Sequence, residues 1–377
     1  MNGHFSNRLP LDLSTSSFFK SVELEKQKKH VDLSLSSPWH ARILDESVFD
    51  EIILKNPFQS ADEAVKKVIS EYYKGKGALL DPNNIVLCSG TSEAYSILFK
   101  VFCDPGDTIL VQKPGYPLLE NLARLEGLKT YPYFLKKPKT EASRFEIDVD
   151  SLISAPFDAK ILMLVSPHNP TGHVLSRGEW RAILEFCKER DLVLIVDEVF
   201  ADYSFVLENF RFEALQSEVS VFYLNGLSKT IGNPDLKLSW IAYQCPPKRV
   251  EKLRNALEYV VDAYLTCSAF AKVAASKLLP QVSYIQKPVL ERLYKNLELY
   301  RKYFPLAPIV EGSWYASLYL GCEDDALFCL RLLRESRVWV QPGFLFDWGE
   351  GWIVLSLLVE TQDLEYALQE IQKMNVL

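Results

Sequence analysis

The sequence lacks the features that mark membrane-spanning, secreted and disulfide-bonded proteins. No apolar run reaches the roughly 18 to 20 residues that a membrane span needs. The first ten residues contain no apolar core of a signal peptide, so we do not expect secretion. The seven cysteines are odd in number and form no C-x-x-C pair, which favours buried thiols in a reducing cytoplasm.

Histidine is also scarce, and two common cofactor motifs are missing. The five histidines form no H-E-x-x-H or similar cluster, so we expect no metal site. We interpret His168, the one beside Asn169, as a packed loop residue rather than a catalytic base. No G-x-G-x-x-G turn follows a predicted strand, which argues against a nicotinamide dehydrogenase. The net charge of −7 argues against nucleic acid as a main partner.

The order of apolar segments predicts an α/β fold. A chain of 377 residues is too long for one ordinary hydrophobic core. A content of 48% hydrophobic and 24% charged residues is typical of a globular protein. Strand-like and helix-like segments alternate from about residue 62 to residue 244, beginning with a helix at 62–73, a strand at 85–88 and a helix at 93–102. This alternation predicts a mostly parallel central sheet with helices on both faces.

The character of the chain changes after Pro246-Pro247. Helical spacing covers 248 to about 279 and 287–304, and strands are expected at 315–320, 338–341 and 352–358 before a last helix. Residues 1–49 show no sustained periodicity. We therefore predict an N-terminal arm (1–49) that packs on the small domain, a large domain (50–280) and a small α+β domain (281–377).

Three polar side chains each follow a strand-like run. Asn169 follows 161–165, Asp197 ends 192–197, and Lys229 follows 221–224. In a parallel sheet these positions meet at the carboxyl edge, where open α/β sheets bind ligands. An amide, a carboxylate and an amine together suit pyridoxal 5'-phosphate (PLP). Taken singly, each residue has an ordinary alternative: a turn residue, a helix cap or a solvated loop lysine.

The motifs Asn169-Pro170-Thr171-Gly172, Asp197-Glu198-Val199-Phe200 and Ser228-Lys229, in this order, resemble the fold-type I PLP-dependent enzymes. Among these the chain is most similar to the class I/II aminotransferases, from about Asp32 to its end. The resemblance implies that Lys229 is the catalytic residue, which forms a Schiff base with PLP and shuttles the proton at the substrate α-carbon. It implies that Asp197 pairs with the pyridine nitrogen and that Asn169 hydrogen-bonds the phenolate oxygen.

The same resemblance assigns the remaining cofactor-binding residues. Thr91 and Ser92 open a helix after a strand, where backbone N–H groups and hydroxyls hold a phosphate. Ser228 is a second phosphate donor, and Lys237 falls where relatives usually carry a phosphate-binding arginine. Tyr116 matches the aromatic residue that stacks on the pyridine ring.

Three departures from the family pattern concern the substrate. Val354 stands where class I enzymes place a carboxylate-binding arginine, which suggests a subgroup without that residue. Either the substrate carboxylate is held differently or the substrate has none there. Phe200 replaces a tyrosine that donates to the phenolate. The partner-subunit tyrosine has no clear match in the region 54–58.

The resemblance therefore implies a PLP-dependent aminotransferase that moves an amino group between an amino acid or amine and a keto acid, and the cysteine pattern favours a cytoplasmic location. A PLP-dependent lyase or decarboxylase and a PLP-binding protein without turnover stay open as alternatives. A homodimer is expected from the family, with no nucleic acid or membrane partner. The substrate pocket is expected to draw on the aromatic residues Trp39, Tyr116, Trp314 and Tyr315, which favours an apolar or aromatic substrate.

Overall fold

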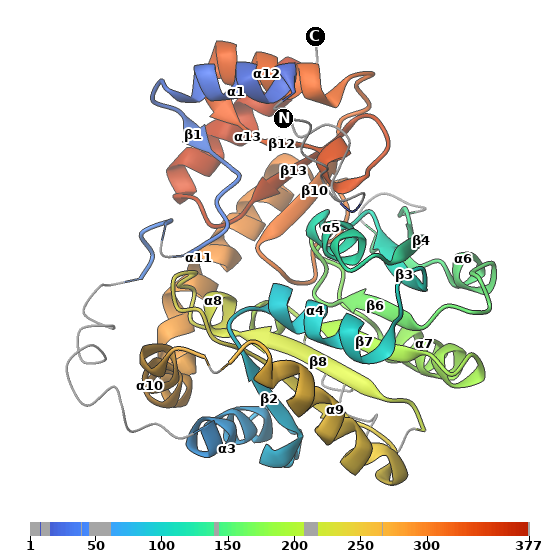
Figure 1. Cartoon of the computed structure of the whole chain (residues 1–377). Coiled ribbons are helices and arrows are strands. Elements are labelled where there is room, and N and C mark those ends of the chain that lie inside the picture. Colours follow the sequence, from blue (N-terminus) through green and yellow to red (C-terminus); the bar gives the residue numbers. More distant parts are fainter. Residues whose placement is uncertain are drawn as a thin grey trace, which may run out of the picture.

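The protein is built around one large sheet and a smaller C-terminal part (Figure 1). The computed structural model describes residues 8, 16–38, 40–44, 62–138, 143–206, 218–265 and 267–375. In Figure 1 the large sheet and its helices lie below, and the C-terminal strands and helices lie above with α1 and β1 beside them. None of the described helices is long and apolar enough to cross a membrane.

The large sheet has eight strands in the order β2-β9-β8-β7-β6-β3-β4-β5. All strands except β9 and β5 run in the same direction, since β9 is antiparallel to both of its neighbours and β5 is antiparallel to β4. The strands are β2 (Ile85–Cys88), β3 (Thr108–Lys113), β4 (Lys129–Lys136), β5 (Glu146–Ile147), β6 (Ile161–Val165), β7 (Val193–Asp197), β8 (Val221–Gly226) and β9 (Ser239–Gln244).

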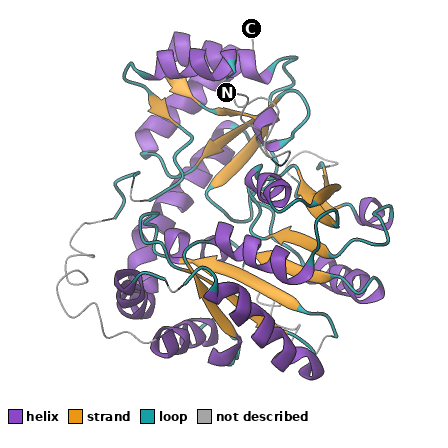
Figure 2. Ribbon diagram, viewed as in Figure 1, coloured by secondary structure: helices purple, strands orange, loops and turns teal. Residues whose placement is uncertain are grey.

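Both faces of this sheet are covered by helices (Figure 2). Every residue of β6 is buried, and alternate residues belong to different cores: Leu162 and Leu164 to one, Ile161 and Met163 to the other. A strand buried on both faces needs such an uninterrupted apolar run. The predicted α/β class is therefore confirmed. One face is covered by α4 (Thr91–Phe102), α5 (Leu118–Leu125) and α9 (Val250–Asp262); the other by α3 (Asp62–Lys74), α7 (Arg177–Glu189), α10 (Ala269–Leu278) and α11 (Val282–Tyr303). The short α6 (Val149–Ile153) follows β5.

The C-terminal part contains an antiparallel sheet of order β10-β13-β12. The N-terminal segment joins this part, because β1 pairs in parallel with β11 and α1 packs against α12. The elements are α1 (Ser17–Lys26), β1 (Val31–Asp32), β10 (Tyr315–Tyr319), α12 (Asp325–Ser336), β11 (Val338–Trp339), β12 (Gln341–Pro342), the 3₁₀ helix η6 (Gly343–Phe346), β13 (Trp352–Ser356) and α13 (Thr361–Asn375).

Three expected segments differ from the structure. Helix α1 was not predicted, because Val22 is its single buried residue and leaves no apolar stripe to detect. The helix expected over 248–279 is two helices, α9 and α10, separated by a turn in which Leu265 has a φ of 64°. Helix α11 begins at Val282 rather than at residue 287, and it continues through Pro288.

Candidate active site

The three strand-end residues come together in one cavity of about 440 Å³. Their strands are adjacent: β6 pairs with β7 so that Val165 lies opposite Asp197, and β7 pairs with β8. Strand β8 runs directly into the short helix α8 (Leu227–Thr230), which carries Lys229. All the site residues expected from the sequence line this cavity: Thr91, Ser92, Tyr116, Asn169, Asp197, Ser228, Lys229 and Lys237.

The amine of Lys229 lies between a backbone oxygen and an aromatic ring. Its Nζ donates to the backbone oxygen of Ser36 at 2.9 Å and lies 4.8 Å from the ring centre of Trp314. Burial lowers the pKa of Lys229 to about 8, with the charge of Asp197 raising it and that of Lys237 lowering it. An amine with this pKa is partly neutral near physiological pH and can act as a nucleophile and base.

Two buried side chains hold the backbone around Lys229 in place. The hydroxyl of Tyr203 donates to the Lys229 carbonyl oxygen at 2.9 Å. The side-chain amide of Gln286, on α11, donates to the Thr230 carbonyl oxygen at 2.7 Å. Both donors are themselves buried, so the turn has little freedom to move.

Asp197 is a buried carboxylate with a donor on each oxygen. The Tyr95 hydroxyl donates to Oδ2 at 2.8 Å, and the Val199 N–H donates to Oδ1 at 3.1 Å. Burial raises the pKa of Asp197, while these two hydrogen bonds and the charge of Lys229 lower it. Such a carboxylate lacks a direct cationic partner among the described residues, so it suits a cationic nitrogen at the cavity wall.

Asn169 presents an amide that has no partner in the described part of the chain. Its Oδ1 is buried and makes no hydrogen bond there. A residue of β10 holds this loop in place: the Ser317 hydroxyl donates to the Pro170 carbonyl oxygen at 3.0 Å. Gly172 has a φ of 71°, and a Cβ on it would lie 2.6 Å from a methyl carbon of Val310, so only glycine fits.

His168 is fully buried, and burial lowers its pKa to about 3, which supports its interpretation as a packed neutral residue.

One end of the cavity is suited to an anion. Helix α4 begins at Thr91, its N-cap Gly90 offers no side-chain hydrogen bond, and a Cβ on Gly90 would meet no atom within 4 Å. The first-turn N–H groups of a helix attract negative charge. Ser228 and the exposed Lys237 line the same cavity and add a hydroxyl and a positive charge.

Tyr116 lies at the mouth of the cavity on a tightly packed turn. Its side chain is 46% exposed, and it precedes α5. A Cβ on the neighbouring Gly115 would lie 2.3 Å from the Gln112 carbonyl oxygen, so this turn requires glycine. The Gly115 N–H donates to the Phe346 carbonyl oxygen at 2.9 Å and ties the turn to the C-terminal part.

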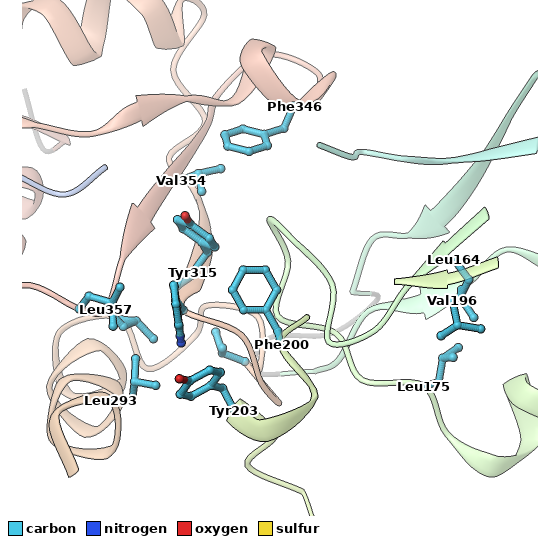
Figure 3. Packing of buried hydrophobic residues seen from close by; sticks show 14 of the residues in the cluster. Leu164, Leu175, Val196, Phe200, Tyr203, Leu293, Tyr315, Phe346, Val354 and Leu357 are labelled. Carbon is cyan, nitrogen blue, oxygen red and sulfur yellow. The ribbon is translucent and has the colours of Figure 1, made fainter. Parts of the chain in front are cut away.

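The residues expected around the substrate separate into different environments. Figure 3 shows Tyr315 in the same buried cluster as Phe200, Phe346 and Val354. Tyr315 lines the cavity together with Phe200 and Phe346. Trp314 is fully buried against Phe200, with ring centres 5.2 Å apart, and does not line the cavity. Val354 is also fully buried, between Ser317 of β10 and Gln341 of β12. Trp39 and the region 54–58 lie outside the described residues.

Two contributors to the site were missed by the sequence analysis. Tyr95 lies four residues after Thr91 on α4, and this helical spacing was the available signal. Ser36 belongs to the N-terminal segment, 193 positions from Lys229, and no local pattern indicates their contact.

The fold and this set of side chains define a fold-type I PLP-dependent enzyme. The amine of Lys229, the buried carboxylate, the N–H donors of the Asn169 side chain and the anion-attracting helix end each complement a different group of PLP, so the residues present fit the cofactor. The chain belongs to the aminotransferase class I and II family, whose model matches residues 54–371. It is a PLP-dependent aminotransferase, as the motifs predicted.

Similar proteins agree with this assignment. The tyrosine aminotransferase of Bos taurus is 30% identical over 339 residues, which cover 85% of this chain and 74% of the relative. The tyrosine aminotransferase of Dictyostelium discoideum is 25% identical, over 85% of this chain and 83% of the relative. In fold, the chain resembles the alanine aminotransferase of Pyrococcus furiosus with a TM-score of 0.84, at 22% identity and with 95% of each chain covered.

Proposed function

We propose that Lys229 is the residue that bonds to PLP and carries the proton in amino transfer. When bound, PLP supplies an electron sink for the substrate carbon that bears the amino group. Lys229 is suited to take and return the proton at that carbon, because burial lowers its pKa to about 8. This half-buried amine beside Asp197 is the observation that carries the proposal.

The other cavity residues would hold the cofactor in one orientation. Asp197 would keep a positive charge on the ring nitrogen, because a buried carboxylate is stabilised by a cation. Asn169 would donate a side-chain amide N–H to the phenolate oxygen, and Tyr116 would cover the ring. The phosphate would be held at the anion-attracting end of the cavity, by Thr91, Ser92, Ser228 and Lys237.

We infer an amino donor with an apolar or aromatic side chain. Apolar and aromatic residues such as Tyr315, Phe346 and Leu119 line much of the cavity. Among the described lining residues the cations are Lys229 and Lys237, both used for the cofactor. The tyrosine aminotransferases among the relatives point to the same kind of side chain.

A substrate panel tests this proposal. PLP-loaded protein is mixed with aromatic, aliphatic and acidic amino acids and with aromatic amines that lack a carboxylate. Conversion of the cofactor to its amino form by aromatic or aliphatic donors, with the matching carbonyl product, supports the proposal. Preference for acidic donors contradicts the substrate class, and release of pyruvate and ammonia without an acceptor contradicts amino transfer.

We also propose the division of the chain and its assembly. An arm (1–49) would pack on a small domain (281–377), and the large domain would span 50–280. The pairing of β1 with β11 supports the place of the arm, and the start of α11 at Val282 supports the boundary between the two domains. We propose a homodimer on the resemblance to the family alone. The seven free cysteines support a reducing cytoplasm. Light scattering on purified protein tests the dimer.

A further inference from the structure

The buried phenol of Tyr95 is hydrogen-bonded to the carboxylate of Asp197. Its side chain is 2% exposed, and its hydroxyl lies 2.8 Å from Oδ2. An ionised carboxylate only accepts hydrogen bonds, so the phenol donates. Burial and the charge of Asp197 raise the pKa of Tyr95 well above its usual range, so the phenol keeps its proton. Tyr95 is therefore a permanent donor to Asp197.

Helix α4 connects this contact to the anion-attracting end of the cavity. Thr91 and Tyr95 are four residues apart, so they lie on the same face of the helix, and both line the cavity. One rigid helix thus fixes the relative positions of an anion-binding turn and of the donor to Asp197.

The hydrogen bonds leave Asp197 able to accept further donors on both oxygens. Oδ1 receives the Val199 N–H and Oδ2 receives the Tyr95 hydroxyl, and each oxygen retains a further acceptor direction. Among the described residues, the charged group facing Asp197 is Lys229. Tyr133 neighbours Tyr95, but its hydroxyl donates to the Met163 carbonyl at 2.7 Å instead.

We propose that Tyr95 is a positioning residue that fixes the Asp197 carboxylate and keeps it a weaker base than the ring nitrogen of the cofactor. A donor on the ionised form of a carboxylate stabilises that form. Without this donor the buried carboxylate becomes more basic, and the proton it shares with the ring moves toward Asp197. This inference rests on the proposed pairing of Asp197 with the ring nitrogen.

Nitrogen NMR on the loaded protein tests the inference. Wild type, Tyr95→Phe, Tyr133→Phe and Asp197→Asn are loaded with PLP labelled with ¹⁵N in the ring, and the chemical shift distinguishes protonated from neutral nitrogen. Tyr133→Phe is the matched control, because it removes a buried tyrosine hydroxyl that does not touch Asp197. Circular dichroism checks folding, and Tyr95→Leu is a second variant without the donor.

We expect the ring nitrogen signal of Tyr95→Phe to move toward the neutral form, while Tyr133→Phe matches wild type. The kcat of Tyr95→Phe should fall about tenfold or more with KM nearly unchanged, as expected for a lost hydrogen bond to a charged group.

An unchanged signal in both Tyr95 variants, with a shifted signal in Asp197→Asn, would overturn the inference and leave the proposed function intact. An unchanged signal in Asp197→Asn would overturn the proposed role of Asp197, and the inference with it.

Discussion

The reactivity of Lys229 toward a small acylating reagent is expected to follow a titration centred near pH 8. Burial lowers the pKa of this amine from 10.5 to about 8. At pH 7.5 roughly one quarter of such an amine is neutral, against about one thousandth for an ordinary lysine. The neutral form reacts, so we expect Lys229 of the cofactor-free protein to be labelled about 200-fold more readily than a surface lysine of equal access.

Two substitutions should move this midpoint in opposite directions. Asp197→Asn removes a negative charge that raises the pKa of Lys229, so the midpoint falls. Lys237→Gln removes a positive charge that lowers it, so the midpoint rises, by less than about one unit because Lys237 is exposed and screened.

Competitive labelling with acetic anhydride, read by mass spectrometry of peptides, measures each lysine separately. The exposed lysines in the same digest are the internal control. A midpoint for Lys229 near 10, or shifts of the same sign in both variants, would refute the electrostatic account of the site.

Three further outcomes are expected. Gln286→Leu leaves the Thr230 carbonyl oxygen without its donor and should lower the free energy of unfolding by about 2 kcal/mol in urea titrations. No loss would mean that this hydrogen bond does not stabilise the fold. Glu179→Gln, beside the buried His173, should cost roughly 3 kcal/mol at pH 7. Burial opposes ionisation of Glu179, but the pairing with His173 and the hydrogen bonds from Ser176, the N-cap of α7, lower its pKa to about 2. Its stabilisation is therefore present above about pH 4.5 and is lost as the pH falls toward 2. Equal losses at pH 7 and pH 2.5 would contradict this. Phe200→Tyr should lower the pH midpoint of the absorption change of the lysine-bound cofactor; a spectrophotometric titration without a downward shift would count against it.

The carboxyl edge of the sheet was predictable because its signals are local. Asn169, Asp197 and Lys229 each follow a short apolar run, and the three runs become adjacent strands. Once the strands are parallel and neighbouring, their carboxyl ends must meet. The fold, the family and the cofactor were therefore within reach of the sequence, whereas the role of each site residue stays a prediction.

The contacts that tune the site were not predictable in the same way. Tyr95 and Asp197 are 102 positions apart, and Lys229 and Ser36 are 193 positions apart. Such pairs depend on how α4 and the N-terminal segment pack, and periodicity within one element carries no information on that. Helix α1 was missed because its single buried residue leaves no apolar stripe, and its place depends on contacts with α12.

The substrate side of the cavity follows from packing between the two sheets. Val354 is fully buried in the small sheet, between Ser317 and Gln341 on the neighbouring strands. The hydrogen bond from the Ser317 hydroxyl to the Pro170 carbonyl oxygen connects this row of residues to the Asn169 loop. The sequence indicated that an arginine is missing at this place. The structure adds that the row is neutral and that Gln341 lines the cavity.

Borohydride reduction of the PLP-loaded protein, followed by peptide mapping, tests the central claim most directly. Reduction fixes the cofactor to the amine that holds it, so the account predicts a phosphopyridoxyl group on Lys229 and none after Lys229→Ala. Attachment to a different lysine of the wild-type protein, or no attachment at all, would contradict the account.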